Sequence, residues 1–183
     1  MSKILEWGYF RYCACRLQSH GTLLHTACDE RRSDVVKVLL GTSDVDARNA
    51  RLFTPLHLCA GALASLPRPS PKDAEAAALC VNLLLKHGAN PNLLDDAGRA
   101  PLHLACLQTG TLQIVEALIE GGADPTLRTT DGLTARQIAD ASRLAALNKQ
   151  VAGLNPKKRK TGLGAGQEKV AEILQEAEAT HAR

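Results

Sequence analysis

The sequence predicts an all-α protein in which pairs of short helices stack on one another. The chain has 183 residues, of which 45% are apolar, so it can form a core of ordinary size. Only five residues are aromatic, and four of these lie in the first twelve positions: Trp7, Tyr9, Phe10 and Tyr12. The remaining core must come from Leu, Val, Ile and Ala, which suits closely packed helices better than a sandwich or barrel. A repeat in the sequence indicates the same architecture.

One phrase recurs along the chain. It reads TLLHTA at 22–27, TPLHLC at 54–59 and APLHLA at 100–105, with a weaker copy, TARQIA, at 134–139. The spacings between copies are 32, 46 and 34 residues. An apolar phrase follows each of the first three copies, at 35–40, 81–85 and 114–119. The second and third of these lead into HGANPN at 87–92 and GGADPT at 121–126.

Each copy contains residues that begin and end helices. Thr54 can cap a helix N-terminus, and Pro55 suits the first helical position because its missing N–H is not needed there. Gly88 and Gly122 follow apolar helices at the point where a residue with positive φ ends a helix. Each unit is therefore predicted to be a short helix, a tight turn, a second helix and an extended finger. Such a pair buries its apolar face only by stacking on its neighbours.

These phrases resemble the ankyrin repeat, which has a period of about 33 residues and the phrase T-P-L-H-x-A. The resemblance covers roughly residues 20–142 and implies an all-α ankyrin-repeat solenoid, whose helix-turn-helix units are joined by β-turn fingers. We expect a stack at 21–142, with repeats at about 21–51, 52–97 and 98–131 and a fourth starting at 132. Outside it we expect an aromatic-rich N-terminal cap at 1–20, a basic Gly-containing loop at 143–166 and a C-terminal capping helix at 167–183.

The sequence departs from the family pattern at several positions. Leu23 stands where the pattern has Pro, and Arg31 and Leu52 stand where it has Gly. The turn at Leu52 should be strained or altered, because a side chain disfavours the conformation that Gly adopts. The last unit lacks both the Pro and the His.

The long second spacing places about 13 extra residues between the helices of the second unit. Ser70 reads as an N-cap, with Pro71 at the first helical position and Asp73 at the third, so a helix is predicted over 71–87. Ser70-Pro71 could also be a proline-directed phosphorylation site or part of a docking segment. A loop followed by a helix extension is the favoured interpretation. The apolar spacing of Val170, Ile173, Leu174 and Ala177 predicts a helix over 167–180, interpreted as the delayed second helix of the last unit.

The residues that invite a chemical interpretation are better explained by structure. His25, His57 and His103 occupy one repeat position, where the imidazole can bond the neighbouring backbone and the Thr. Asp95 and Asp96 are expected in a solvated finger. No catalytic residue, metal site or cofactor is predicted, because no phosphate-binding, nucleophile or zinc-protease motif occurs. The chain is therefore predicted not to be an enzyme.

The cysteines are also assigned structural positions. Cys28, Cys59 and Cys106 stand at small-residue positions between helices. Cys13 and Cys15 lack the C-x₂-C spacing of a zinc site. All six cysteines are interpreted as free thiols in a reducing compartment. No apolar run of about 18 residues occurs, so a cytoplasmic or nuclear location away from membranes is expected.

The positive charge is concentrated late in the chain. The net charge is +3, and residues 142–183 carry eight basic and four acidic side chains. Lys157-Lys158-Arg159-Lys160 matches a nuclear-import pattern that an import carrier would bind, although such runs also occur as plain solvated loops. Direct nucleic-acid binding is disfavoured, because no aromatic residue lies nearby to stack on a base.

The family resemblance implies a protein-interaction module, an adaptor, scaffold or inhibitor, that binds one partner through its fingers and inner helix ends. The family's variable positions correspond here to Arg48, Arg51, Phe53, Leu94, Asp96, Arg99, Leu107, Gln108, Arg128 and Leu133. Arginines beside an apolar anchor suit a partner with carboxylates and a hydrophobic residue. We expect a monomer. The alternatives are a nuclear factor that associates with nucleic acid or transcription machinery through residues 156–160, and, less favoured, a redox or metal enzyme that uses the cysteines.

Overall fold

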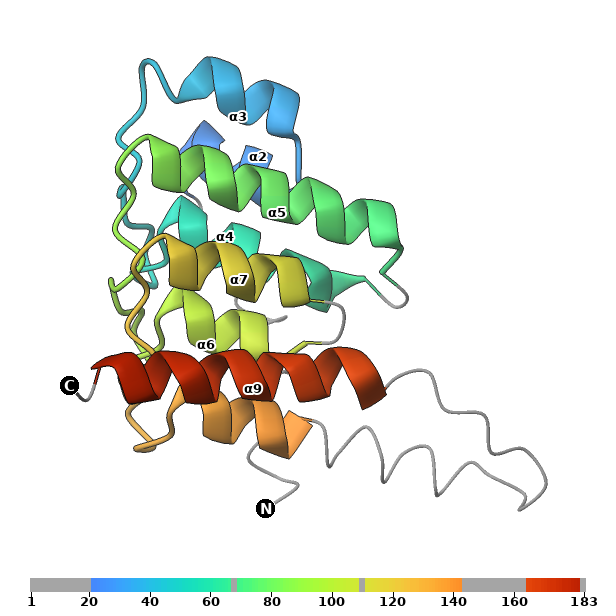
Figure 1. The fold of residues 1–183 in the computed structure, drawn as a ribbon. Coiled ribbons are helices and arrows are strands. Elements are labelled where there is room, and N and C mark those ends of the chain that lie inside the picture. The colour runs from blue at the N-terminus through green and yellow to red at the C-terminus, as the bar shows by residue number, and fades with distance from the viewer. Residues whose placement is uncertain (1–20, 67–68, 109–110, 143–163, 182–183) are drawn as a thin grey trace.

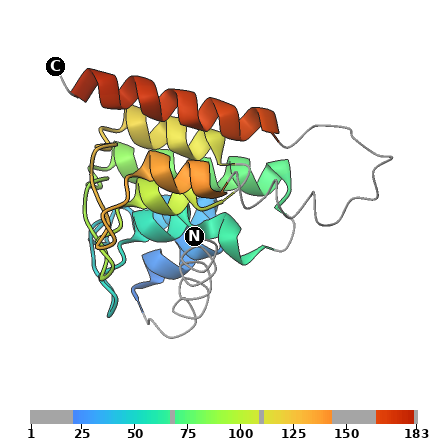
Figure 2. The same cartoon turned by 90° about the horizontal axis from the view of Figure 1, so that it is seen from below.

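The structure is a computed structural model that describes residues 21–66, 69–108, 111–142 and 164–181. The described helices form two layers (Figures 1 and 2). The inner layer consists of α2 (Leu23–Asp29), α4 (Pro55–Ala60), α6 (Pro101–Cys106) and helical residues 135–142. The outer layer consists of α3 (Ser33–Leu39), α5 (Pro71–Lys86), α7 (Leu112–Glu120) and α9 (Gly164–His181). A short 3₁₀ helix, η1 (Ala62–Ser65), lies between α4 and α5.

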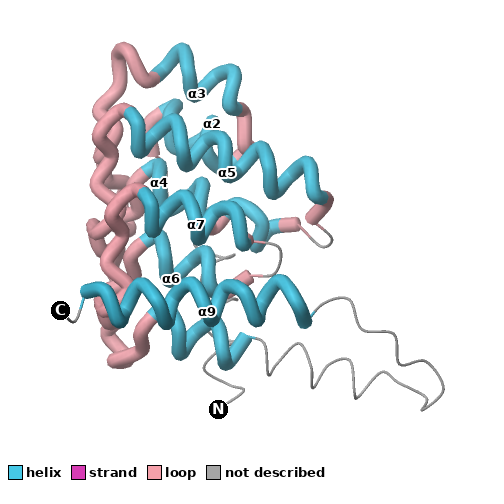
Figure 3. The backbone as a smooth tube through the Cα atoms, in the orientation of Figure 1, coloured by secondary structure: helices cyan, strands magenta, loops and turns pink. Residues whose placement is uncertain are grey.

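The predicted all-α stack is confirmed. In the inner layer α2 packs against α4 and α4 packs against α6, and in the outer layer α3, α5, α7 and α9 pack in succession. The connecting fingers gather along one side of the stack (Figure 3). Across the described ranges, β-structure is limited to an isolated bridge between Arg128 and Thr134.

The core is built from aliphatic side chains, as the composition predicts. Leu24, Leu56 and Leu102 occupy the same position in successive units, and each is fully buried. The outer helices contribute residues such as Val81 and Leu118, which are also fully buried. The helices of one unit pack against each other, and their apolar faces also meet those of neighbouring units, which is the stacking that a single helix pair requires.

The predicted capping residues of the second unit are confirmed. The helix expected at 71–87 is α5, and the Ser70 side chain accepts a hydrogen bond from the Asp73 N–H at 3.3 Å. The Asp73 carboxylate in turn accepts from the Ser70 N–H at 2.9 Å, which completes a capping box. The extra residues of the 46-residue spacing therefore lie partly in the loop that contains η1 and partly in the first turns of α5.

The turn residues behave as their positions predict. Gly88 and Gly122 have φ of 85° and 87°. Arg31 and Leu52 replace glycine in the family pattern, and they keep the same left-handed backbone, with φ of 59° and 60°. The altered turn expected at Leu52 is therefore a glycine-type turn that carries a side chain, which costs about 1 kcal/mol or more.

The helix expected at 167–180 is present as α9, which packs against α7. The expectations for residues 1–20, for Cys13 and Cys15, and for Lys157, Lys158, Arg159 and Lys160 lie outside the described residues. Among the helices that the structure describes, none is long and apolar enough to cross a membrane.

Candidate functional site

The fingers are held in shape by one polar residue in each turn. Asp95 Oδ1 accepts hydrogen bonds from the N–H groups of Ala97 and Arg99 at 2.9 and 2.8 Å. Asn49 makes the equivalent pair of bonds in the preceding finger. Asp95 is only 5% exposed, so placing it in a solvated finger was wrong. Its buried carboxylate organises the turn instead of facing the solvent.

Successive fingers are joined to one another. The Asp96 N–H donates to the Arg51 carbonyl at 3.2 Å, and the Thr130 N–H donates to the Ala97 carbonyl at 3.1 Å. The Arg51 guanidinium also pairs with the Asp96 carboxylate at 2.9 Å. The finger row is therefore a connected surface rather than a set of independent loops.

The repeated histidines connect each inner helix to the finger that follows. His57 Nδ1 accepts the Thr54 N–H at 3.1 Å, so Nε2 carries the proton and donates to the Arg99 carbonyl at 3.0 Å. His25 makes the equivalent contacts with the Thr22 N–H and the Phe53 carbonyl. His103 Nδ1 accepts the Ala100 N–H, and its Nε2 donates to the Leu127 carbonyl, which stands earlier in its finger than the Arg99 carbonyl does in the preceding one. The predicted structural role of the three histidines is confirmed.

Burial determines the protonation of these histidines. It lowers the pKa of His57 to about 4, against a weaker opposing effect of the hydrogen bond to the Arg99 carbonyl. Burial also lowers the pKa of His25 and His103. All three rings are therefore neutral near pH 7, which the single Nε2–H donor requires. In the fourth unit, Gln137 Oε1 accepts the Thr134 N–H at 2.9 Å and so replaces the Nδ1 half of this arrangement.

The described cysteines are buried between helices. Cys28, Cys59, Cys80 and Cys106 are each free and at most 2% exposed. Burial raises the pKa of the Cys106 thiol to about 12 and raises that of Cys59 above its usual value. A thiol with a raised pKa is a poor nucleophile at neutral pH. Within the described part of the chain, no group of three or more His, Cys, Asp or Glu residues could hold a metal ion.

The structure leaves several predicted contact residues accessible. Arg48, Asp96 and Arg128 are exposed, while Arg51, Leu94, Leu107 and Leu133 are half-buried. Arg48, Arg51, Leu94, Asp96, Arg128 and Leu133 lie on the fingers, and Leu107 lies at the end of α6. Arg128 is oriented by a hydrogen bond from Nη1 to the Gly132 carbonyl at 2.8 Å.

Three predicted contact residues need correction. Phe53 is 1% exposed and Gln108 is 8% exposed, so neither presents a side chain to a partner. Phe53 lies edge-on to the His57 ring, and Gln108 Nε2 donates to the Leu104 carbonyl at 2.9 Å. Arg99 is committed to the finger, because its Nε pairs with Asp95 at 2.7 Å and its guanidinium lies over the Phe53 ring at 5.8 Å.

Leu52 is an exposed residue of the first finger that was not among the contact residues predicted from the sequence. Its side chain is 41% exposed at a position that is Gly98 or Gly132 in the later fingers. The replacement of glycine by leucine predicts an altered turn, and it also places an apolar side chain on the finger. We define the finger surface as Arg48, Arg51, Leu52, Asp96 and Arg128.

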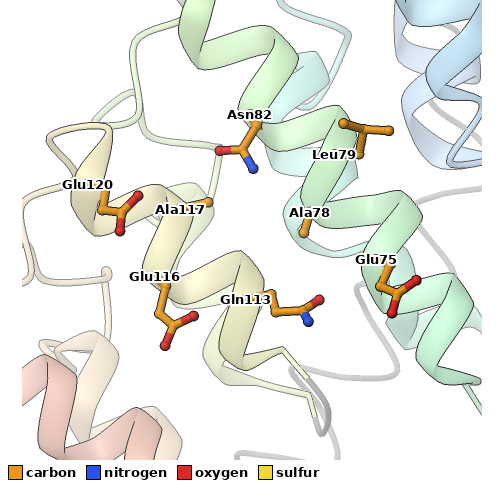
Figure 4. A pocket seen from close by; sticks show the side chains of 8 residues that line it. All are labelled: Glu75, Ala78, Leu79, Asn82, Gln113, Glu116, Ala117 and Glu120. Atoms are coloured by element: carbon orange, nitrogen blue, oxygen red, sulfur yellow. The ribbon is translucent and has the colours of Figure 1, made fainter.

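Apart from the finger surface, a groove lies on the outer layer, between α5 and α7 (Figure 4). Its volume is about 390 Å³, with Ala78 and Ala117 between rows of longer side chains. Three of those side chains are the carboxylates of Glu75, Glu116 and Glu120. This groove is acidic and shallow, and it lies on α5 and α7, apart from the finger surface.

The repeat architecture and the histidine contacts define a repeat protein of the ankyrin class. The family profile described as ankyrin repeats (many copies) matches residues 84–139, and the profile described as ankyrin repeat matches residues 20–50 and 51–96. The chain belongs to the ankyrin repeat family.

Three curated relatives share part of the chain. Human BCL-6 corepressor-like protein 1 is 32% identical over 66% of this chain and 6% of its own length. The mouse B-cell lymphoma 3 protein homolog is 33% identical over 69% of this chain and 27% of its own length. Human ankyrin repeat and MYND domain-containing protein 1 is 48% identical over 33% of this chain and 6% of its own length. The chain thus corresponds to a minor part of each of these relatives.

Proposed function

We propose that this chain is a non-enzymatic adaptor, scaffold or inhibitor that binds one protein partner through the finger surface. The observation that carries the proposal is the presence of two exposed arginines, Arg48 and Arg128, and an exposed leucine, Leu52, on one connected row of fingers. Ankyrin repeats are protein-interaction modules, so a protein is the appropriate class of partner. Leu94, Leu107 and Leu133 would extend the apolar part of the contact.

The chemistry of the finger surface indicates what the partner should carry. Arg48 and Arg128 are exposed on the first and third fingers, and guanidinium groups pair with carboxylates in a bidentate geometry. Leu52 supplies an exposed apolar group on the first finger. We therefore expect an acidic partner segment with at least one hydrophobic side chain. Because the fingers are already joined, little ordering is required on binding, and this favours affinity.

The names of relatives support a regulatory role. One is a corepressor-like protein, and another, 45% identical over 29% of this chain, is human protein phosphatase 1 regulatory subunit 27. We propose that α9 caps the 21–142 stack. The chain would act as a monomer.

The test compares two charge reversals in the full chain. The finger variant is Arg48→Glu with Arg51→Glu and Arg128→Glu, and the control reverses three exposed lysines of the outer helices, Lys37, Lys72 and Lys86. Each chain serves as bait in affinity capture, and each captured protein is then purified and titrated. We expect the finger variant to lose a partner that the wild type and the control both retain. Equal binding by both variants would refute the finger surface as the site, provided that circular dichroism shows all three chains folded.

A second candidate role rests on the basic run at 157–160. Four adjacent cations would be bound by a nuclear import carrier and would place the adaptor in the nucleus as well as the cytoplasm. Deleting residues 156–160 should abolish nuclear accumulation of a fluorescent fusion and leave partner capture intact. Loss of partner capture in the deletion would instead favour the alternative in which this segment contacts nucleic acid or transcription machinery.

A further inference from the structure

The chain contains two places where a hydroxyl residue precedes proline, Thr54-Pro55 and Ser70-Pro71. Proline-directed protein kinases recognise such a pair, so the sequence alone does not separate them. The structure does, because Thr54 is fully buried and its hydroxyl lies 2.8 Å from His57 Nδ1. Ser70 and Pro71 are both exposed.

Ser70 is also presented in a suitable backbone conformation. Its φ and ψ are −83° and 160°, which is extended, and it stands immediately before α5. A groove of about 340 Å³ adjoins it, lined in part by Pro69, Ser70 and Pro71, so the residue can be approached from the side. A kinase that grips an extended substrate would need to open only the first turn of α5 beyond Pro71.

The capping box controls that opening. The Ser70 hydroxyl donates to Asp73 Oδ2 at 2.6 Å, and the Ser70 N–H donates to the same oxygen. These bonds lower the pKa of the Asp73 carboxyl, with a smaller contribution from Arg31, whose Nε lies 3.7 Å away. The Asp73 carboxylate is therefore ionised near pH 7, and its hydrogen bonds hold Ser70 in the capping position at the start of α5.

We propose that Ser70 is a site of proline-directed phosphorylation, gated by the capping box of α5. Ser70 Oγ would form a bond to the γ-phosphorus of ATP on the kinase. The bond from that phosphorus to the bridging oxygen breaks, ADP leaves, and the hydroxyl proton passes to the base of the kinase. The phosphoserine can no longer donate to Asp73, and its dianion repels that carboxylate. The N-terminus of α5 accepts the new charge, and Asp73 is left with Arg31.

The first measurement uses the full chain with a purified proline-directed serine/threonine kinase and Mg-ATP, followed by phosphopeptide mapping. Synthetic peptides spanning 50–60 and 66–76 serve as unfolded substrates for Thr54 and Ser70. We expect both peptides to be modified, but only Ser70 in the folded chain, with no incorporation in Ser70→Ala. The proposal would be overturned if Thr54 were modified in the folded chain. It would also be overturned if Ser70 were modified in the 66–76 peptide but not in the folded chain.

The second measurement tests the gate. Asp73→Ala should raise the initial rate at Ser70 several-fold in the folded chain, because the box is lost. Lys72→Ala removes an exposed charged side chain from the same turn, outside both the capping box and the groove, and should leave the rate unchanged. Each rate is divided by that of the 66–76 peptide with the same substitution, which removes any preference of the kinase itself. Equal ratios for the two variants would overturn the gating.

Discussion

His57 should make the stability of the stack sensitive to mild acid. The ring is buried, and its pKa of about 4 lies below the 6.5 expected in the unfolded chain. Between these two values the unfolded state binds more protons than the folded state, so stability falls as the pH falls. The stabilising contribution is complete above pH 6.5 and is lost as the pH approaches 4.

The magnitude follows from the size of the shift. Each unit of pKa difference corresponds to about 1.4 kcal/mol, and lowering the pH from 7 to 4.5 covers roughly two units of the interval. The change per pH unit is smaller close to either pKa, so the titration of His57 alone should lower the free energy of unfolding by about 2 kcal/mol over that range. A domain typically has about 5–15 kcal/mol in total. Burial lowers the pKa of His25 and His103 as well, so both act in the same direction.

The assay compares the wild type with His57→Gln by urea denaturation at pH 7, 6, 5 and 4.5. Glutamine can accept the Thr54 N–H and donate to the Arg99 carbonyl, but it does not titrate. The variant should be less stable at pH 7, and the gap should close by about 2 kcal/mol at pH 4.5. Other titrating groups are common to both proteins and cancel in the comparison. Parallel pH profiles would refute a neutral, buried His57.

Three further predictions concern the packing, the turns and the helix cap. Phe53→Ala should lower the free energy of unfolding by about 3–5 kcal/mol, since the ring is 1% exposed; a change under about 0.5 kcal/mol in urea denaturation would mean that the ring is at the surface. Gly98→Ala should cost more than Gly132→Ala in thermal unfolding, because both have positive φ but only the first Cβ would meet a backbone atom, Thr130 N, at 2.9 Å; equal losses would contradict this close approach. Ser70→Ala should cost about 1 kcal/mol through loss of the α5 cap, and amide exchange that does not quicken in the first turn of α5 would contradict the cap.

The parts of the fold that local chemistry determines were predictable from the sequence. The start of α5 follows from Ser70, Pro71 and Asp73, which carry their capping roles within one turn. Gly88 likewise predicts the positive φ that its turn adopts. The exchange of hydrogen bonds within the TPLH phrase is similarly local, so the structural role of His57 could be assigned before its partners were visible.

The exposure of the finger residues was harder to predict, because it depends on contacts between units. Phe53 and Arg99 occupy equivalent positions in successive fingers, and both were expected to face a partner. In the structure the guanidinium of Arg99 lies over the ring of Phe53, so the two side chains contact each other instead of facing a partner. Asp95 was misplaced for the same reason, since its second oxygen is used by Arg99. Repeat alignment identifies equivalent positions but not which of them a neighbouring unit covers.

The histidine contacts give the stack a direction. His25 donates forward to the Phe53 carbonyl, and His57 donates forward to the Arg99 carbonyl. Removing the second unit would therefore strand the buried His25 donor, and removing the third would strand that of His57, whereas His103 donates to Leu127 within its own unit. Removing an earlier unit strands none of these histidines. At equal length, trimming from the carboxyl side should damage the remainder more than trimming from the amino side. In the fourth unit the hydrogen bond of Gln137 is to the Thr134 N–H of the same unit, so it does not depend on a following unit.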